Sequence, residues 1–116
     1  MSYNIKTIKS FDKEFKRLSK RYRSLKEDLI AFIEELQSNP YSGVDLGNHI
    51  HKVRMSISSK GKGKSHGARI ITSTSAIISM EDGEITLLYI YDKSEQSSIS
   101  DSFIERLVEE ADLDQE

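Results

Sequence analysis

The fold of this chain is decided between His51 and Ile71, where the sequence reads HKVRMSISSKGKGKSHGARII. Apolar and polar residues alternate from His51 to Ser58, as in a strand with one buried face and one exposed face. Lys52 and Arg54 belong to the exposed set. A second strand is expected to begin at about Ala68, where β-branched residues resume. The pattern predicts two neighbouring strands with a cationic outer face.

The loop between these strands alternates lysine with glycine at Lys60, Lys62 and Lys64. In an extended chain, alternate side chains project to the same side. Glycine between them lets the backbone approach a ligand closely. Folding alone gives no reason to collect like charges, so we expect the three lysines to bind an anion, with nucleic acid as the natural candidate.

Two other motifs lie in this region. Residues 63–65 read Gly-Lys-Ser, the end of a phosphate-binding P-loop, but Ser58 stands where that motif needs glycine, and a strand follows instead of a helix. We therefore exclude a P-loop. His49 and His51 would share a strand face, yet the chain has no cysteine and Asp45 is the one carboxylate nearby. A metal site is not expected, and both histidines are interpreted as exposed or loop residues.

Charge is distributed unevenly along the 116 residues, although the net charge is only −2. Residues 1–40 carry nine Lys/Arg against six Asp/Glu, and residues 41–70 carry six against one. Residues 71–116 carry two against twelve. A basic middle and an acidic C-terminal part indicate that one surface faces nucleic acid and another does not.

The residues before the basic stretch predict a strand and two helices. Alternation over 2–9 indicates a short strand, and Ser10 is expected to cap a helix with Phe11 on its apolar stripe. A second helix is expected after Ser24 and ends at Asn39-Pro40. We expect 41–48 to be a loop.

The residues after it predict two strands and a helix. The strand from Ala68 is expected to continue through Met80, with Asp82 and Gly83 in a hairpin turn. Residues 84–93 are apolar on both faces, as in a central strand covered by helices, and Ser98 is expected to cap a last helix. The sequence thus predicts an α+β fold, β-α-α-β-β-β-α, with an antiparallel twisted sheet packed against an N-terminal helical hairpin and a C-terminal helix.

Length and composition are those of one domain spanning 1–116. The absence of cysteine favours a reducing compartment, and the charged N-terminal residues and short apolar runs predict neither a signal peptide nor a membrane span. We expect a cytoplasmic protein.

The combined motifs resemble the RelE/ParE superfamily of bacterial type II toxins, and its HigB-like branch most of all. They are Lys52-Val-Arg54, Lys-Gly-Lys-Gly-Lys, Gly67-Ala-Arg69-Ile-Ile and Tyr89-Ile-Tyr91-Asp92-Lys93-Ser94-Glu95. The resemblance covers Phe11 to about Leu107. It implies a toxin held inactive in a complex with a cognate antitoxin, and a ribosome-dependent endoribonuclease that cuts mRNA without a metal or other cofactor.

The resemblance also implies where the catalytic residues lie. Lys52 and Arg54 match the basic pair on the first strand after the helices, Arg69 matches the arginine that opens the next strand, and Lys93 lies where the family has its last catalytic groups. No tyrosine follows Lys93 as in some RelE proteins, so the general acid stays open. Its candidates are His66, Tyr91 and Lys93. Tyr91 could alternatively stack on an exposed base.

Two other functions remain compatible with these residues. A gyrase inhibitor, as in the ParE branch, would bind a protein partner without cutting RNA. A non-catalytic RNA-binding or regulatory module on the same fold would bind RNA without toxicity. The lysine-glycine loop favours RNA binding over gyrase inhibition.

Overall fold

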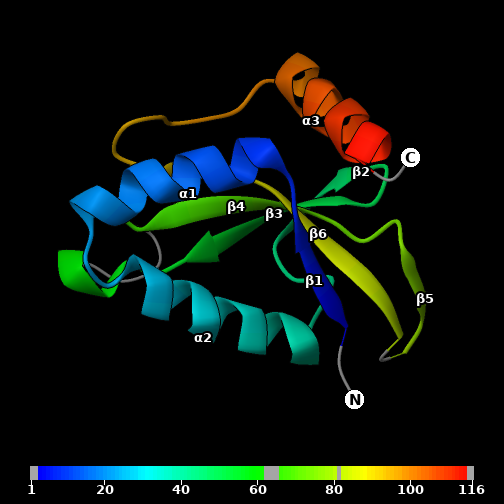
Figure 1. Cartoon of the computed structure of the whole chain (residues 1–116), viewed down its shortest axis with the longest axis horizontal. Helices are drawn as coiled ribbons and strands as arrows, with labels where there is room; N and C mark the ends of the chain where they lie inside the picture. Colours follow the sequence, from blue (N-terminus) through cyan, green and yellow to red (C-terminus); the bar gives the residue numbers. More distant parts are fainter. Residues whose placement is uncertain (1–2, 62–65, 81, 115–116) are drawn as a thin grey trace.

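The computed structural model describes residues 3–61, 66–80 and 82–114. In chain order its elements are β1 (Asn4–Thr7), α1 (Lys9–Arg21), α2 (Leu25–Ser38), β2 (Val44–Gly47), β3 (Ile50–Met55), the short 3-10 helix η1 (Ser58–Lys60), β4 (Ala68–Ser73), β5 (Ile77–Ser79), β6 (Asp82–Asp92) and α3 (Asp101–Asp114) (Figure 1). Among the described residues, no helix is long and apolar enough to cross a membrane.

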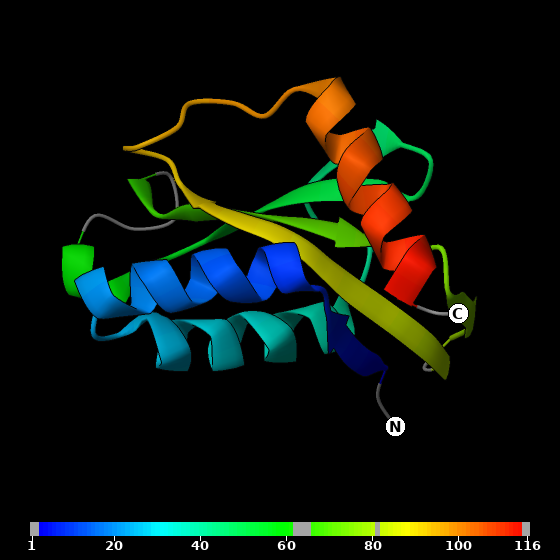
Figure 2. The same ribbon diagram turned by 45° about the horizontal axis from the view of Figure 1, so that its top comes forward.

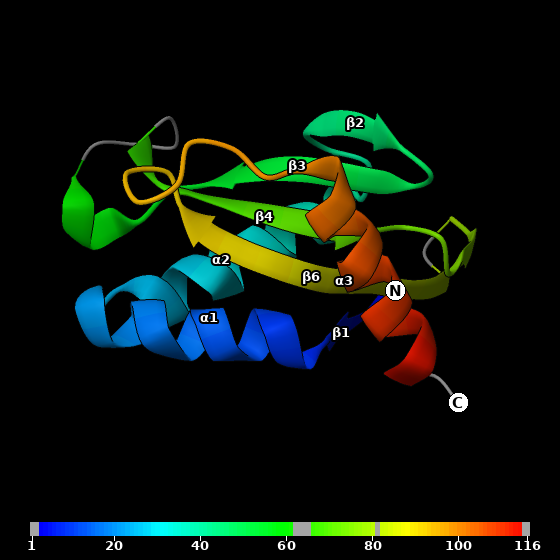
Figure 3. The same cartoon turned by 90° about the horizontal axis from the view of Figure 1, so that it is seen from above.

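The strands form an open sheet in the order β1-β6-β4-β3-β2, and β5 pairs with β6 outside this path. Figure 3 shows β6, β4 and β3 fanning apart, as expected of a twisted sheet. Every pairing is antiparallel except that of β1 with β6, which is parallel. The expected antiparallel arrangement is therefore confirmed for the strands that follow the two helices, and β1 is the exception.

Helices cover β6 on both faces. Leu87 and Leu88 point to opposite faces of this strand, and both are fully buried. In Figure 2, β6 runs between the α1–α2 pair and α3. On the α3 side, Phe103 packs edge to face on Tyr89, with ring centroids 4.9 Å apart. The predicted α+β class, with a helical hairpin and a last helix packed on the sheet, is confirmed.

The connection expected over 41–48 instead contains β2, which pairs with β3 through Val44 and Lys52. The other difference is the length of the strand after the basic loop. It ends at Ser73 because a tight turn follows, in which the backbone N–H of Ile77 donates to the carbonyl of Thr74 at 3.1 Å. β5 is consequently a separate strand.

Turn and cap residues also differ from expectation. Asp82 and Gly83 are the first residues of β6, not a turn. Ser10 lies inside α1, and its backbone N–H donates to the Glu110 carboxylate of α3 at 3.0 Å. The last helix is capped by Ser100, whose hydroxyl accepts from the Phe103 N–H at 3.2 Å, and not by Ser98. These caps depend on local geometry that short polar motifs do not specify.

Candidate active site

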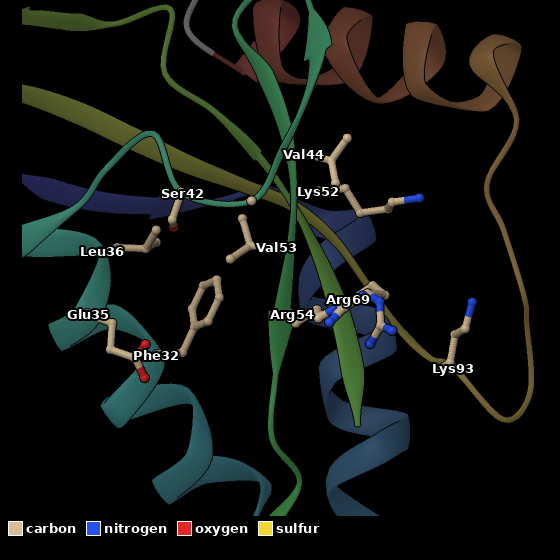
Figure 4. Close-up of a pocket in the computed structure, with 11 residues that line it drawn as sticks. Phe32, Glu35, Leu36, Ser42, Val44, Lys52, Val53, Arg54, Arg69 and Lys93 are labelled. Atoms are coloured by element: carbon tan, nitrogen blue, oxygen red, sulfur yellow. The ribbon is translucent and has the colours of Figure 1, made fainter. Parts of the chain in front are cut away.

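A cavity of about 510 Å³ opens where β3, β4 and the end of β6 meet α2 and β2. We call it the cationic cavity because its lining includes Lys52, Arg54, Arg69 and Lys93. Its apolar lining comes from Phe32, Leu36, Val44 and Val53, and Glu35 and Ser42 also border it. Figure 4 shows the four cations on one side of β3 and the α2 residues on the other. The predicted basic residues of β3 and β4 and the residue after β6 therefore line one cavity.

The strand register explains why the arginines meet. Arg54 of β3 lies opposite Arg69 of β4, and Arg69 lies opposite Tyr91 of β6. Directly opposed residues on neighbouring strands have side chains on the same face, within contact distance. Two like charges in this position destabilise a sheet. The arrangement is consequently explained better by a bound anion than by stability.

Arg69 is the most buried of the four cations, with 6% of its surface exposed. Burial lowers the pKa of its guanidinium below the ordinary arginine value, and the neighbouring charge of Arg54 lowers it further. One of its NH groups donates to the carbonyl of Ala68 at 3.2 Å. A buried charge next to a like charge is stabilised by an anion that enters between them.

Lys52 and Lys93 stand at the rim of the same cavity. Lys52 is half-buried and Lys93 is exposed. Neither forms an ion pair with any residue in the described part of the chain, and the same holds for Arg54. The Lys93 ammonium donates to the carbonyl of Ser97 at 3.1 Å. Three of the four cations are thus left without a carboxylate partner among the described residues.

A close backbone contact shapes the other wall of the cavity. Gly43 runs so near to β3 that a Cβ atom there would lie 2.3 Å from the Lys52 carbonyl oxygen. Only glycine fits at this distance, and its φ of +90° also favours glycine. Sequence reasoning missed this wall and the α2 residues Phe32 and Glu35. Gly43 was the signal that could have revealed the wall, because isolated glycines mark close backbone approach.

Lys60, which was predicted to contact RNA, does not border the cationic cavity. Its ammonium donates to the Asp92 carboxylate at 3.0 Å and to the His66 carbonyl at 2.8 Å. Only 14% of its side chain is exposed. A lysine held in this way has little exposed side chain for RNA, and an RNA contact by Lys60 stays a prediction. Lys62 and Lys64 lie outside the described residues.

Two of the three candidates for the general acid lie apart from the cavity lining. His66 is exposed and does not border the cavity. Tyr91 is 2% exposed and does not border it either, and burial raises the pKa of its phenol, an effect that the charge of Arg69 opposes. A ring so deeply buried cannot stack on a base. Lys93 is the candidate that the fold brings to the cavity.

The two neighbouring histidines have unlike surroundings. His49 is exposed in the turn between β2 and β3, as expected. His51 is 5% exposed and contacts Tyr41 edge to face, so the expectation of an exposed or loop residue was wrong for it. Within the described residues, no group of three potential metal-ligating side chains comes together.

Comparisons with known proteins identify a family and a shared fold. The family model described as the RelE toxin of the RelE/RelB toxin-antitoxin system matches residues 7–113. A solved structure of a double-arginine mutant of the E. coli toxin RelE in the free state superposes with a TM-score of 0.55. The superposition includes 84% of this chain and 90% of the RelE chain, and the two sequences are 15% identical. The likeness indicates a shared fold. No curated protein sequence matched.

Proposed function

The chain belongs to the RelE toxin family, and on this premise we propose that it is a ribosome-dependent endoribonuclease that cuts mRNA. The resemblance to the RelE/ParE superfamily is thereby confirmed, whereas the HigB-like branch stays a prediction. The observation that carries the proposed activity is the convergence of Lys52, Arg54, Arg69 and Lys93 on one cavity. An RNA phosphate is the anion that such a site would bind.

The proposed reaction can proceed without a metal, because the RNA supplies its own nucleophile. The 2′-hydroxyl of one nucleotide attacks the phosphorus of the adjacent phosphodiester, and the bond from phosphorus to the 5′ oxygen breaks. The products are a 2′,3′-cyclic phosphate and a 5′-hydroxyl end. One side chain must accept the 2′-hydroxyl proton, another must protonate the leaving oxygen, and cations must stabilise the extra negative charge.

The two arginines and the two lysines suit different steps of this reaction. Arg54 and Arg69 suit the phosphate, because a guanidinium stays charged and can donate two parallel hydrogen bonds to it. A lysine can exchange its proton, so we assign proton transfer to Lys52 and Lys93. Lys52 in its neutral form would accept the 2′-hydroxyl proton. Lys93 in its charged form would donate to the 5′ oxygen.

The apolar half of the cavity would receive the nucleoside. Phe32, Leu36 and Val44 line the same cavity as the cations, and Figure 4 shows Val44 beside Lys52, with Phe32 and Leu36 across β3. Ligand sites commonly pair such an apolar surface with a few polar groups that fix orientation. We therefore expect the scissile phosphate to lie on the β3–β4 side and the neighbouring base or sugar to lie toward α2.

Cleavage of mRNA in a translation extract tests the proposal. Purified protein is added to the extract, and primer extension locates breaks in the message. We expect breaks within translated codons for the wild type and none for Arg69→Ala. Lys13→Ala, which removes an exposed cation of α1, is the matched control and should cleave like the wild type.

Three outcomes would separate this proposal from its alternatives. Intact message at a dose that arrests translation would exclude the nuclease. Inhibition of DNA supercoiling without mRNA cleavage would favour a gyrase inhibitor. Salt-dependent RNA binding without growth arrest would favour a non-catalytic module. Co-expression with the neighbouring gene tests the proposed antitoxin partner, which should restore growth and co-purify with the chain.

A further inference from the structure

Asp92, at the end of β6, is a fully buried carboxylate outside the cationic cavity. It accepts hydrogen bonds from the Lys60 ammonium at 3.0 Å and from the Tyr22 hydroxyl. It also accepts from the Ser94 N–H at 2.9 Å and the Ser94 hydroxyl at 2.8 Å. The donors come from the end of α1, from η1 and from the segment after β6. One carboxylate thus joins three separate parts of the chain.

These donors keep Asp92 charged in the interior. Burial alone would raise the pKa of its carboxyl, but the hydrogen bonds from Tyr22, Ser94 and Lys60 outweigh burial and hold the pKa below the usual aspartate value. A buried charge is tolerated only when it is paired and hydrogen-bonded. Loss of one donor would therefore leave the buried carboxylate incompletely hydrogen-bonded.

The network is next to the proposed catalytic groups. Asp92 precedes Lys93 in the chain, and the Lys93 N–H donates to the Gly67 carbonyl at 3.1 Å. Asp92 also lies opposite Ala68, the residue before Arg69. Asp92 is therefore next to Lys93 in the chain and directly across the sheet from the residue before Arg69.

Lys60 extends the same network to the basic loop. Its ammonium donates both to Asp92 and to the carbonyl of His66, so it joins residue 60 to residue 66 across the loop. Gly67, the next residue, is held just as closely, because a Cβ atom there would lie 2.2 Å from the Met55 carbonyl oxygen of β3. Both ends of the loop are thus held by contacts to Asp92 and to β3.

We propose that Asp92, through Lys60 and Tyr22, is a positioning residue that places Lys93 relative to Arg69 for RNA cleavage. The inference rests on the proposed nuclease function. Asp92 does not touch the substrate. It acts by holding the end of β6, and misplacement of a catalytic group by about 1 Å can reduce a rate about 100-fold.

Asp92→Asn tests this role, because it removes the charge and keeps the size of the side chain. On ribosomes programmed with one message, we expect kcat to fall about 100-fold and KM to change little. Tyr22→Phe keeps the ion pair and removes one donor, so it should fold normally and lower kcat by a smaller factor. Unchanged kcat in the folded fraction of both variants would overturn the proposal, as would a change confined to KM.

Glu95→Gln is the matched control. It makes the same chemical change in the same segment, but Glu95 pairs with Arg17 and Arg21 of α1 and does not line the cavity. We expect its kcat to stay within about twofold of the wild type. A loss equal to that of Asp92→Asn would show that any weakening of the segment reduces activity, and would overturn a specific role for Asp92.

A second readout keeps this inference separate from the proposed function. In a ¹⁵N-labelled chain, the amide signals of Lys93 and Gly67 should shift in Asp92→Asn and Tyr22→Phe, and remain in place in Glu95→Gln. Unmoved signals in the first two variants would overturn the positioning role. If the wild type itself cleaves no mRNA, the proposed function fails, and the amide signals still decide whether Asp92 positions Lys93.

Discussion

Lys52 and Lys60 belong to the same basic stretch of sequence, but the fold gives them opposite surroundings. Lys60 is largely buried and paired with Asp92. Lys52 borders the cationic cavity and forms no ion pair with a described residue. A cation with a buried partner holds the structure together, whereas a cation that faces a cavity without a carboxylate is available to a ligand. The partner, and not the residue type, separates the two roles.

The largest effect expected from this comparison is on stability. Lys60→Met leaves the buried charge of Asp92 without its ion-pair partner, and breaking a buried pair from one side costs about 3–5 kcal/mol. Lys52→Met removes no such partner and should cost less than about 1 kcal/mol. Urea unfolding of both variants measures the difference. Equal losses would contradict the contrast between the two lysines.

The next largest effect is expected on activity. It should come from loss of a cation that borders the cavity, and not from loss of the buried, paired cation. Arg54→Met removes a cation that borders the cavity and has no ion pair among the described residues. We expect mRNA cleavage to fall about 10²- to 10³-fold, as when one donor to a transition-state charge is lost. Stability should stay the same or increase, because the pKa of Arg69 is no longer lowered by a like charge. Single-turnover cleavage and thermal unfolding check the two parts, and a destabilised but active variant would contradict them.

The pH dependence of stability should show whether Asp92 is charged in the folded protein. The folded state holds the pKa of this carboxyl below its unfolded value of about 3.9. Its contribution to stability is therefore present above that pH and is lost as the pH falls through the folded-state pKa. The wild type should lose stability below about pH 4, and Asp92→Asn should lose less over the same range. Unfolding free energies measured from pH 7 downward test this, and parallel curves would count against it.

The smallest effect is expected at Glu95, which pairs with Arg17 and Arg21 at 2.8 and 2.6 Å. The hydrogen bond from Arg17 holds the pKa of the Glu95 carboxyl below its ordinary value. Both arginine side chains are half exposed, however, so water screens the network. Glu95→Gln should cost less than about 1 kcal/mol in urea unfolding, and most of that cost should disappear in high salt. A loss comparable to that of Lys60→Met would show that exposed pairs matter as much as the buried one.

Much of the fold could be predicted because its apolar patterns are local. One strand contains Val53, and another contains Leu87 and is apolar on both faces. In each, the pattern of apolar residues along the strand predicts which side chains are buried. β2 was missed because it is short, exposed on both faces and bounded by glycine. The break after Ser73 was missed because the turn from Thr74 to Ile77 contains neither glycine nor proline, the residues that usually mark a turn in a sequence.

Some residues of the candidate site could also be predicted from the sequence, and others could not. Lys52, Arg54, Arg69 and Lys93 were predicted from the basic motifs and the family resemblance, and the fold brings them to one cavity. The sequence did not indicate that Phe32 and Glu35 of α2 would border them. That requires α2 to pack beside β3, which depends on the tertiary arrangement.

By itself, the sequence determined the alternation that forms the strands, the apolar stripes of the helices and the concentration of basic residues in the middle of the chain. Only the tertiary structure decided which of those basic residues are neutralised. Asp92 reaches Lys60 because β6 ends beside η1, and no carboxylate in the described residues pairs with Lys52. Charge pairing depends on distances of a few ångströms between segments far apart in sequence, and only the folded chain sets those distances.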